Sequence, residues 1–241
     1  MNPIKNHRGF TLVEILFALA IGLVVVGAIY MAMITGQRSS VGIEQRVSAA
    51  QDIRGALEVM SMEIAMASFN PNFVPGIWRD PNSGPGCLGP SANQAFKGIQ
   101  VATRDAITVE MDITAPGGGL EDGIIGNGGN NEIIAYVYDF PNRRITRSTN
   151  CGGAQSFLGE TAGLPGRSVR VMNGEPAVNL PVFRYFDGQG VEIIGGGAIP
   201  NIRRIEIALA VETENVDPAS QQRQRMVYTN GVIIRNHAFS P

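Results

Sequence analysis

The stretch Arg8-Gly9-Phe10-Thr11-Leu12-Val13-Glu14, with the apolar run 15–34 that follows it, decides how this chain is organised. Between Glu14 and Arg38 lie 23 residues without a charge. A helix of about twenty apolar residues rises about 30 Å, which matches the hydrocarbon core of a bilayer. The run therefore predicts a transmembrane helix. The alternatives are a core helix buried on every side and a cleaved secretory signal, whose apolar part is usually shorter.

The composition of the whole chain narrows the function classes. Of its 241 residues 44% are hydrophobic and 17% are charged, whereas an ordinary soluble domain is about one quarter charged. The 19 Lys and Arg are outnumbered by 21 Asp and Glu, which argues against a basic nucleic-acid binder. The apolar content argues against a disordered acidic tail. Two Cys cannot supply the four thiolates of a structural zinc site, and two His are few ligands for the metal of a metalloenzyme.

The residues before the apolar run predict both orientation and processing. Lys5, His7 and Arg8 should stay cytoplasmic, so the bulk of the chain is expected outside the inner membrane. The junction resembles the class III signal of type IV pilins and of the pseudopilins of type II secretion. That resemblance implies that a prepilin peptidase cuts between Gly9 and Phe10 and then N-methylates Phe10. Loss of residues 1–9 leaves 17 basic against 21 acidic residues, so the net charge changes from −2 to −4.

Glu14 is the single carboxylate at the start of the apolar segment. A lone carboxylate in such a segment is costly and is a functional candidate by default. The family resemblance implies that Glu14 meets the N-terminal amine of a neighbouring subunit in a filament. Such a pair would neutralise both charges and set the axial register. The alternative is that Glu14 simply lies at the membrane interface, near the lipid headgroups.

The helix is expected to continue beyond the membrane with one apolar face. The residues at helical spacing are Ile43, Val47, Ala50, Ile53, Leu57, Met60 and Ile64. Asn70-Pro71 should end the helix, because a residue before proline disfavours the helical conformation. The predicted helix from Phe10 to about Ala67 is about 87 Å long. The segment from Gly36 to Gly42 is either a place where the helix bends or melts, or a place of close helix packing.

From residue 99 onward the hydrophobic period changes to two, which indicates strands. The clearest strands are 107–113 and 205–211, and others are expected at 132–140, 143–148, 168–172, 182–186, 191–194 and 226–235. The predicted fold class is α+β, with a long N-terminal transmembrane and amphipathic α-helix packed against a mainly antiparallel, pilin-like β-sheet head. The expected divisions are a leader peptide (1–9), a transmembrane or filament-core half (10–35), an amphipathic half (36–68) and a β-rich head (69–241).

Three features of the predicted loops carry further expectations. Trp78, in the proline-rich loop 70–98, either plugs the edge of the head or is an exposed contact. Cys87 and Cys151 lie in glycine-flanked loops on the oxidising side of the membrane, which predicts a disulfide; two free thiols are the alternative. Such a bridge closes a 65-residue loop and is worth about 4 kcal/mol. The Gly/Asn-rich loop 117–132 offers oxygen ligands for calcium, but turns explain it without a cofactor.

The remaining observations concern activity and partners. G-x-S-x-G and H-E-x-x-H do not occur, and Glu206 and Glu212 occupy polar positions of a strand, so an enzyme is not expected. Segments 50–67, 183–187 and 202–207 resemble PilW-like minor pilins. The resemblance implies a minor pilin that joins other minor and major pilin subunits at an inner-membrane assembly platform and initiates or caps a type IV pilus. Nucleic acid is not expected as a primary partner. Alternatives are a GspJ-like minor pseudopilin, a pilus-tip adhesin, or an anchored binding domain that never polymerises.

Overall fold

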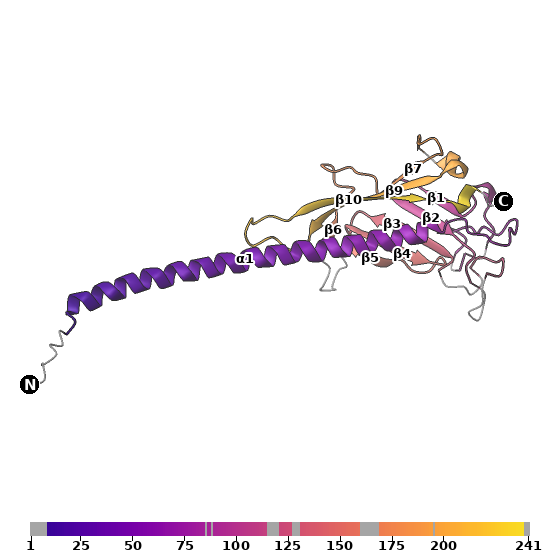
Figure 1. Ribbon diagram of the computed structural model, residues 1–241. Coiled ribbons are helices and arrows are strands. Elements are labelled where there is room, and N and C mark those ends of the chain that lie inside the picture. Colours follow the sequence, from indigo (N-terminus) through magenta and orange to yellow (C-terminus); the bar gives the residue numbers. More distant parts are fainter. Residues whose placement is uncertain are drawn as a thin grey trace, which may run out of the picture.

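The computed structural model describes residues 9–84, 86–87, 89–114, 121–126, 131–159, 169–194 and 196–238. One long helix, α1 (Leu12–Ala65), carries a head of two antiparallel β-sheets on its C-terminal half (Figure 1). The N-terminal half of α1 projects away from the head, and the C-terminus lies at the opposite end of the molecule. The architecture is α+β, as the sequence predicts.

The first sheet is a meander in which each strand pairs with the next one along the chain, in the order β1-β2-β3-β4-β5. Its strands are β1 (Ile99–Ala102), β2 (Ala106–Glu110), β3 (Ile133–Asp139), β4 (Arg144–Thr149) and β5 (Gln155–Gly159). The 3₁₀ helix η1 (Gln94–Phe96) precedes it. Most residues of 70–98 form turns and loops, as their five prolines predict.

The second sheet has the order β10-β9-β7-β8, and β6 pairs with the far end of β9. Its strands are β6 (Val169–Val171), β7 (Phe183–Phe186), β8 (Glu192–Ile193), β9 (Arg204–Thr213) and β10 (Arg225–Ile233). Two further 3₁₀ helices are η2 (Gly196–Asn201) and η3 (Asn236–Ala238). The inner faces of both sheets and one face of α1 share a single hydrophobic core.

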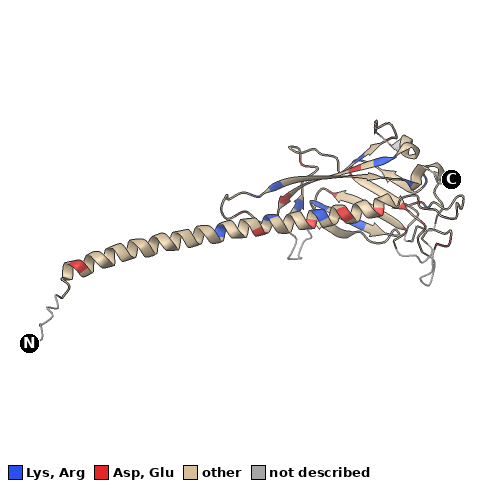
Figure 2. Cartoon of the chain, in the orientation of Figure 1, with Lys and Arg blue, Asp and Glu red and all other residues tan. Residues whose placement is uncertain are grey.

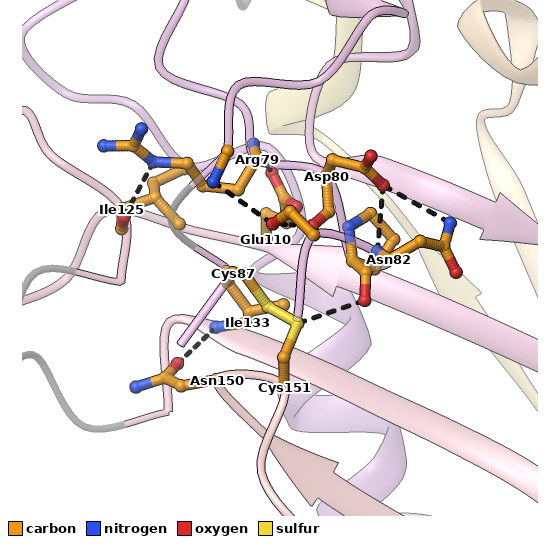
Figure 3. Close-up of a disulfide and its surroundings, with 12 residues drawn as sticks. Arg79, Asp80, Asn82, Cys87, Glu110, Ile125, Ile133, Asn150 and Cys151 are labelled. Carbon is orange, nitrogen blue, oxygen red and sulfur yellow. Dashed lines mark hydrogen bonds between the residues drawn. A yellow bond between two sulfur atoms is a disulfide. The ribbon is translucent and has the colours of Figure 1, made fainter. Parts of the chain in front are cut away.

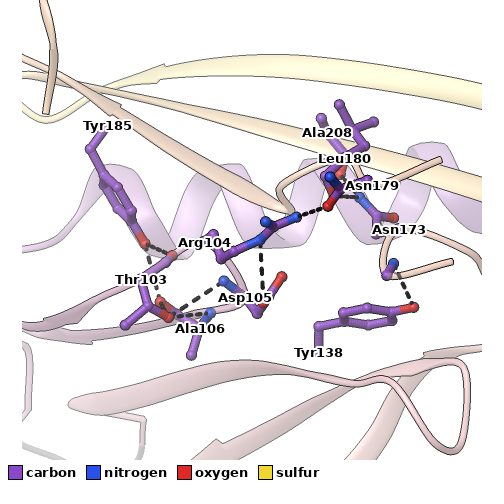
Figure 4. Close-up of polar contacts among 11 residues, drawn as sticks. Thr103, Arg104, Asp105, Ala106, Tyr138, Asn173, Asn179, Leu180, Tyr185 and Ala208 are labelled. Atoms are coloured by element: carbon purple, nitrogen blue, oxygen red, sulfur yellow. Dashed lines mark hydrogen bonds and ion pairs between the residues drawn. The ribbon is translucent and has the colours of Figure 1, made fainter. Parts of the chain in front are cut away.

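The turn between β1 and β2 joins the two sheets (Figure 4). The Tyr185 hydroxyl of β7 donates to the Thr103 carbonyl at 2.8 Å. The Arg104 carbonyl accepts the backbone N–H groups of Val182 and Phe183 at 2.9 and 3.0 Å. The last two bonds satisfy the N–H groups of Val182 and Phe183, which are both buried.

A second junction lies between β3 and the segment after β6. The Tyr138 hydroxyl donates to the Val171 carbonyl at 3.2 Å and accepts the Gly174 N–H at 3.0 Å. The side chain of Asn173 donates to the Ala208 carbonyl at 2.8 Å, and Figure 4 shows Tyr138 on one side of this junction and Asn173 with Ala208 on the other. Together the two junctions hold the sheets at a fixed separation along α1.

The buried face of α1 differs in part from the predicted one. Its buried residues are Gly42, Ala49, Ile53, Ala56, Leu57, Met60 and Ile64. The prediction was wrong for Ile43 and Val47, which are 60% and 50% exposed. Ala50 is only half-buried. The physical reason is that the sheets cover α1 continuously only from Ala49 onward.

At Gly42 the tip of the β9–β10 hairpin touches α1. A Cβ atom added to Gly42 would meet the Asp217 carboxylate oxygen at 2.6 Å. The helix is continuous through Gly36 and Gly42. At Gly42 the structure therefore agrees with close packing, whereas a Cβ added to Gly36 would meet nothing within 4 Å.

Strand boundaries also deviate from the predicted ones where backbone groups leave the ladder. The strand predicted at 107–113 ends at Glu110 as β2. The next amides donate elsewhere, Met111 to the Glu132 carbonyl and Asp112 to the Phe69 carbonyl, both at 2.9 Å. The strand β5 lies outside all of the predicted strand ranges.

Candidate functional site

The N-terminal segment forms the start of α1. Gly9 and Phe10 precede the helix, and Thr11 is its N-cap. Glu14 and Thr11 form a capping box, in which the Glu14 carboxylate accepts the Thr11 backbone N–H at 2.8 Å and its hydroxyl at 2.9 Å. The Thr11 hydroxyl in turn accepts the Glu14 N–H at 3.3 Å. Glu14 thus has a local role in beginning the helix, which the sequence analysis did not consider.

Among the described residues, none packs around the apolar half of α1. Phe10 is 84% exposed, and the most apolar 18-residue window of α1 has a mean hydropathy of 2.7 with none of it buried. Figure 2 shows neither a red nor a blue residue on this half between one acidic residue near its start and the first basic residue near the head. An apolar surface of this extent requires lipid or other apolar helices around it.

Within the described residues, α1 is the one helix that is long and apolar enough to cross a membrane. The most apolar part of this helix lies near the N-terminus, close in sequence to the basic residues of segment 1–8. Residues 1–8 of the predicted leader 1–9 lie outside the described residues, and Gly9 is the first described one. The structure therefore places the predicted cleavage point, between Gly9 and Phe10, in exposed backbone just before the helix.

A partly buried ionic cluster attaches the other half of α1 to the first sheet. The Arg147 guanidinium of β4 makes a bidentate pair with Glu63, with Nη2–Oε1 at 2.6 Å and Nε–Oε2 at 3.0 Å. The Tyr136 hydroxyl of β3 donates to the same carboxylate. Bidentate pairs fix geometry as well as adding energy. This cluster holds α1 at one register against the head.

The end of α1 is attached to the C-terminal segment through His237. Its Nδ1 lies 2.7 Å from the Ser68 hydroxyl, and its Nε2 lies 2.9 Å from the Ile199 carbonyl. Because a carbonyl only accepts, Nε2 carries the proton and Nδ1 accepts the hydroxyl proton. His237 is fully buried, and burial lowers its pKa to about 4. Repulsion by Arg203 and Lys97 contributes to the same lowering, and the hydrogen bond to the Ile199 carbonyl opposes it.

We expect the contribution of His237 to the stability of the head to fall between pH 6.5 and pH 4. The unfolded chain binds a proton near pH 6.5, whereas the folded chain resists it until about pH 4. Stability is therefore present above pH 6.5 and is lost as the pH falls through this window, by about 3 kcal/mol. Urea unfolding of the detergent-solubilised full chain at several pH values measures the loss.

The control for this prediction is His237→Gln, which has no titrating ring. Glu110 acts in the opposite direction, because burial raises its pKa to about 8 and it stabilises the fold increasingly as the pH falls from 8 to 4.5. The difference between the native chain and His237→Gln isolates the histidine. Equal slopes for the two chains between pH 6.5 and 4 would contradict the assignment.

A disulfide closes the proline-rich loop onto the first sheet (Figure 3). Cys87 and Cys151 are bonded, with their Cα atoms 5.5 Å apart. Cys87 is fully buried, and the Cys151 sulfur lies 3.3 Å from the Pro81 carbonyl. Trp78 is 1% exposed and packs in a small cluster with Ile77 and Cys87. Trp78 is therefore the plug at the edge of the head, and is not an exposed contact.

Beneath this loop lies a buried carboxyl group, Glu110. Its Oε2 accepts the Arg79 backbone N–H at 2.9 Å, and the Arg79 guanidinium donates to the Ile125 carbonyl at 3.0 Å. At a pKa of about 8 the carboxyl is mostly protonated at neutral pH. Figure 3 shows Glu110 and Arg79 close to the disulfide. Glu110 therefore packs beneath the loop as a mostly neutral group.

The carboxylates that flank the Gly/Asn-rich loop bind backbone N–H groups. Asp112 accepts the N–H of Asp122 at 3.3 Å and of Gly123 at 3.0 Å. Glu132 accepts three N–H groups, those of Ile113, Thr114 and Gly126, at 2.7–3.2 Å. Residues 117–120 and 127–130 of the calcium candidate lie outside the described residues. Among described residues, no group of three or more His, Cys, Asp or Glu is placed to hold a metal.

The comparisons with known proteins concern the same N-terminal segment. Residues 4–30 match the family model described as the prokaryotic N-terminal methylation motif. No curated protein and no solved structure matches the chain. This chain thus carries the prokaryotic N-terminal methylation motif, the signal of type IV pilins and pseudopilins, at the start of its exposed apolar helix.

Proposed function

We propose that this chain is a PilW-like minor pilin that is incorporated into a type IV pilus and helps to initiate or cap filament assembly. The methylation motif at residues 4–30 carries the proposal, because it stands on an apolar half-helix that the head leaves entirely uncovered. Such a helix can pass from the bilayer into a bundle of equivalent helices with little change in its surroundings. The role is structural, with no reaction catalysed by the chain itself.

The proposed processing follows the motif. Prepilin peptidase cuts between Gly9 and Phe10 and methylates the new N-terminus at Phe10. Residues 1–9 are then the leader, 10–35 the membrane and filament-core half, 36–68 the amphipathic half and 69–241 the head. Before assembly the chain is a single-pass inner-membrane protein with its head in the periplasm. Its partners are the peptidase, other minor and major pilin subunits and the inner-membrane assembly platform.

The competing proposal is a GspJ-like minor pseudopilin of type II secretion, which would use the same signal and helix. A deletion strain separates the two, with surface pili counted in the sheared fraction and exported proteins measured in the medium. Lost pili with normal export support the minor pilin. Lost export with normal pili supports the pseudopilin. If neither changes, a tip adhesin or an anchored domain that never polymerises gains support. Trp78 is buried, so its side chain is not available as an adhesive contact.

We propose no cofactor for this function, and the carboxylates beside the Gly/Asn-rich loop provide a test. Asp112 and Glu132 already accept two and three backbone N–H groups, and N–H groups repel a cation. Excess EDTA or millimolar calcium should therefore change the unfolding midpoint of the full chain in detergent by less than about 2 °C. A calcium-dependent rise of several degrees would instead support the calcium loop.

A further inference from the structure

The strand β10 has a long free edge of a kind that proteins usually protect. Its nine residues pair with β9 without a bulge, and Arg225 is its one charged residue. Natural edge strands are typically short, bulged or charged, because an open edge invites another strand. The other edges of this head follow that rule: β8 has two residues, and the ladders that bind β1 and β5 both contain register shifts.

The hydrogen-bond register shows which backbone groups of β10 face outward. At one end the Thr213 N–H donates to the Gln224 carbonyl, and at the other the Ile234 N–H donates to the Arg203 carbonyl. Pairs in an antiparallel ladder alternate between bonded and non-bonded. The even-numbered residues of β10 therefore bond to β9, and the odd-numbered ones direct their N–H and C=O groups to the free edge. Within the described residues, the backbone groups of these odd-numbered residues have no partner.

The helix α1 contacts the inner face of β10, and all odd-numbered residues of β10 are exposed. Asn230 donates to the Ser61 hydroxyl at 2.7 Å, and Arg54 lies over the Tyr228 ring at 5.9 Å. Both β10 residues are even-numbered. The odd-numbered side chains point to the opposite, outer face, where Val227 and Ile233 are 62% and 63% exposed. The edge thus presents both unpaired backbone groups and uncovered apolar side chains.

We infer that the β10 edge is an assembly surface that pairs with an extended strand from a different subunit. An extended backbone is the partner that matches a regular row of alternating donors and acceptors. Its outer-face side chains should be neutral and apolar, because they would lie beside Val227 and Ile233. The partner strand needs no acidic residue opposite Arg225, because the Arg225 guanidinium already donates to the Glu212 carboxylate at 3.0 Å.

A second copy of this chain fits the edge poorly. The contacts of Tyr228 with Arg54 and of Asn230 with Ser61 show that β10 runs in the direction of α1. Two copies anchored in one membrane hold α1 parallel, so their β10 strands would also be parallel. If a two-fold axis parallel to the strands related the two copies, each odd-numbered residue would lie opposite the same residue of the other copy. Each outward N–H would then face an N–H instead of a carbonyl. The other sheet edges that a second copy could offer, at β1, β5 and β8, are short or irregular, so the partner strand belongs to another kind of subunit.

This inference rests on the proposed function, and amide hydrogen exchange of the full chain tests it. We would compare the chain extracted from membranes with the chain in sheared filaments. The amides of Val227, Thr229 and Gly231 should exchange quickly before assembly and at least about tenfold more slowly within the filament. The amides of Tyr228 and Asn230 should be slow in both states. Equally fast exchange of the odd-numbered amides in filaments would overturn the inference.

A pair of variants at one position gives an independent test. Thr229→Pro removes an outward N–H that makes no bond within the head, whereas Thr229→Val keeps it. Losing one interchain bond should lower the amount incorporated into filaments at least about fivefold for Thr229→Pro alone. Equal incorporation of the two variants would overturn the inference. If the chain never enters filaments, as the Glu14 variants below would reveal, the proposed function fails instead.

Discussion

Replacing Glu14 with Gln is expected to abolish incorporation into filaments while leaving the chain processed and in the membrane. In the proposed filament the Glu14 carboxylate pairs with the N-terminal amine of a neighbouring subunit. An amine left without its partner in an apolar bundle costs about 3–5 kcal/mol, which corresponds to a loss of at least about a hundredfold. Quantifying the chain in the sheared fraction and in membranes measures this loss. The mass of its N-terminal peptide reports cleavage and methylation.

The capping box supplies the controls for this prediction. Gln can replace Glu in the box, so Glu14→Gln removes the charge and keeps the helix start. Thr11→Val does the reverse: it removes the hydroxyl that contacts Glu14 at 2.9 Å and keeps the charge. Losing this cap costs the helix about 1 kcal/mol, so Thr11→Val should retain most of the assembly. If Thr11→Val assembled no better than Glu14→Gln, the carboxylate would act through the helix start.

The long-range architecture of α1 could be predicted because it depends on local patterns. Apolar residues without charge indicate the membrane half, and a 3.6-residue period indicates the half that meets the head. The position on α1 at which the head begins to cover the helix could not be predicted in this way. Ile43 and Val47 continue the apolar period, yet both are at least half exposed. An apolar position in a filament-forming helix can face either its own head or a neighbouring subunit, and the pattern is the same.

The parts of the head that sequence reasoning missed depend on partners distant in the chain. The strand β5 has no clear alternation, and its pairing with β4 makes it a strand. His237 meets Ser68 across 169 positions, and no local motif announces a buried histidine. The disulfide is different, because two Cys in an oxidising compartment allow one pairing. The capping box is a local motif of Thr11 and Glu14, whereas the lone charge of Glu14 in an apolar segment predicts a role in assembly; the same carboxylate fits both patterns.

The double variant Cys87→Ala/Cys151→Ala is expected to lose about 4 kcal/mol of unfolding free energy. The bridge spans a sequence separation of 64 residues, and removing it restores the loop entropy of the unfolded chain. For a chain of this size the unfolding midpoint should fall by roughly 10 °C. The single tryptophan gives a local readout: Trp78 packs with Cys87, so its fluorescence should shift to the red as the loop loosens.

The two single variants distinguish the crosslink from the packing of the sulfur atoms. Cys151 is half-buried, so Cys151→Ala alone loses little packing and yet breaks the bridge. If the crosslink stabilises the head, this single variant should cost nearly as much as the double variant. It should also make the chain insensitive to reductant, whereas reduction of the native chain reproduces the loss. Cys87 is fully buried, so Cys87→Ala should cost slightly more. A cost below about 1 kcal/mol for Cys151→Ala would mean that burial of the loop, with Trp78 at its centre, holds this edge of the head without the bridge.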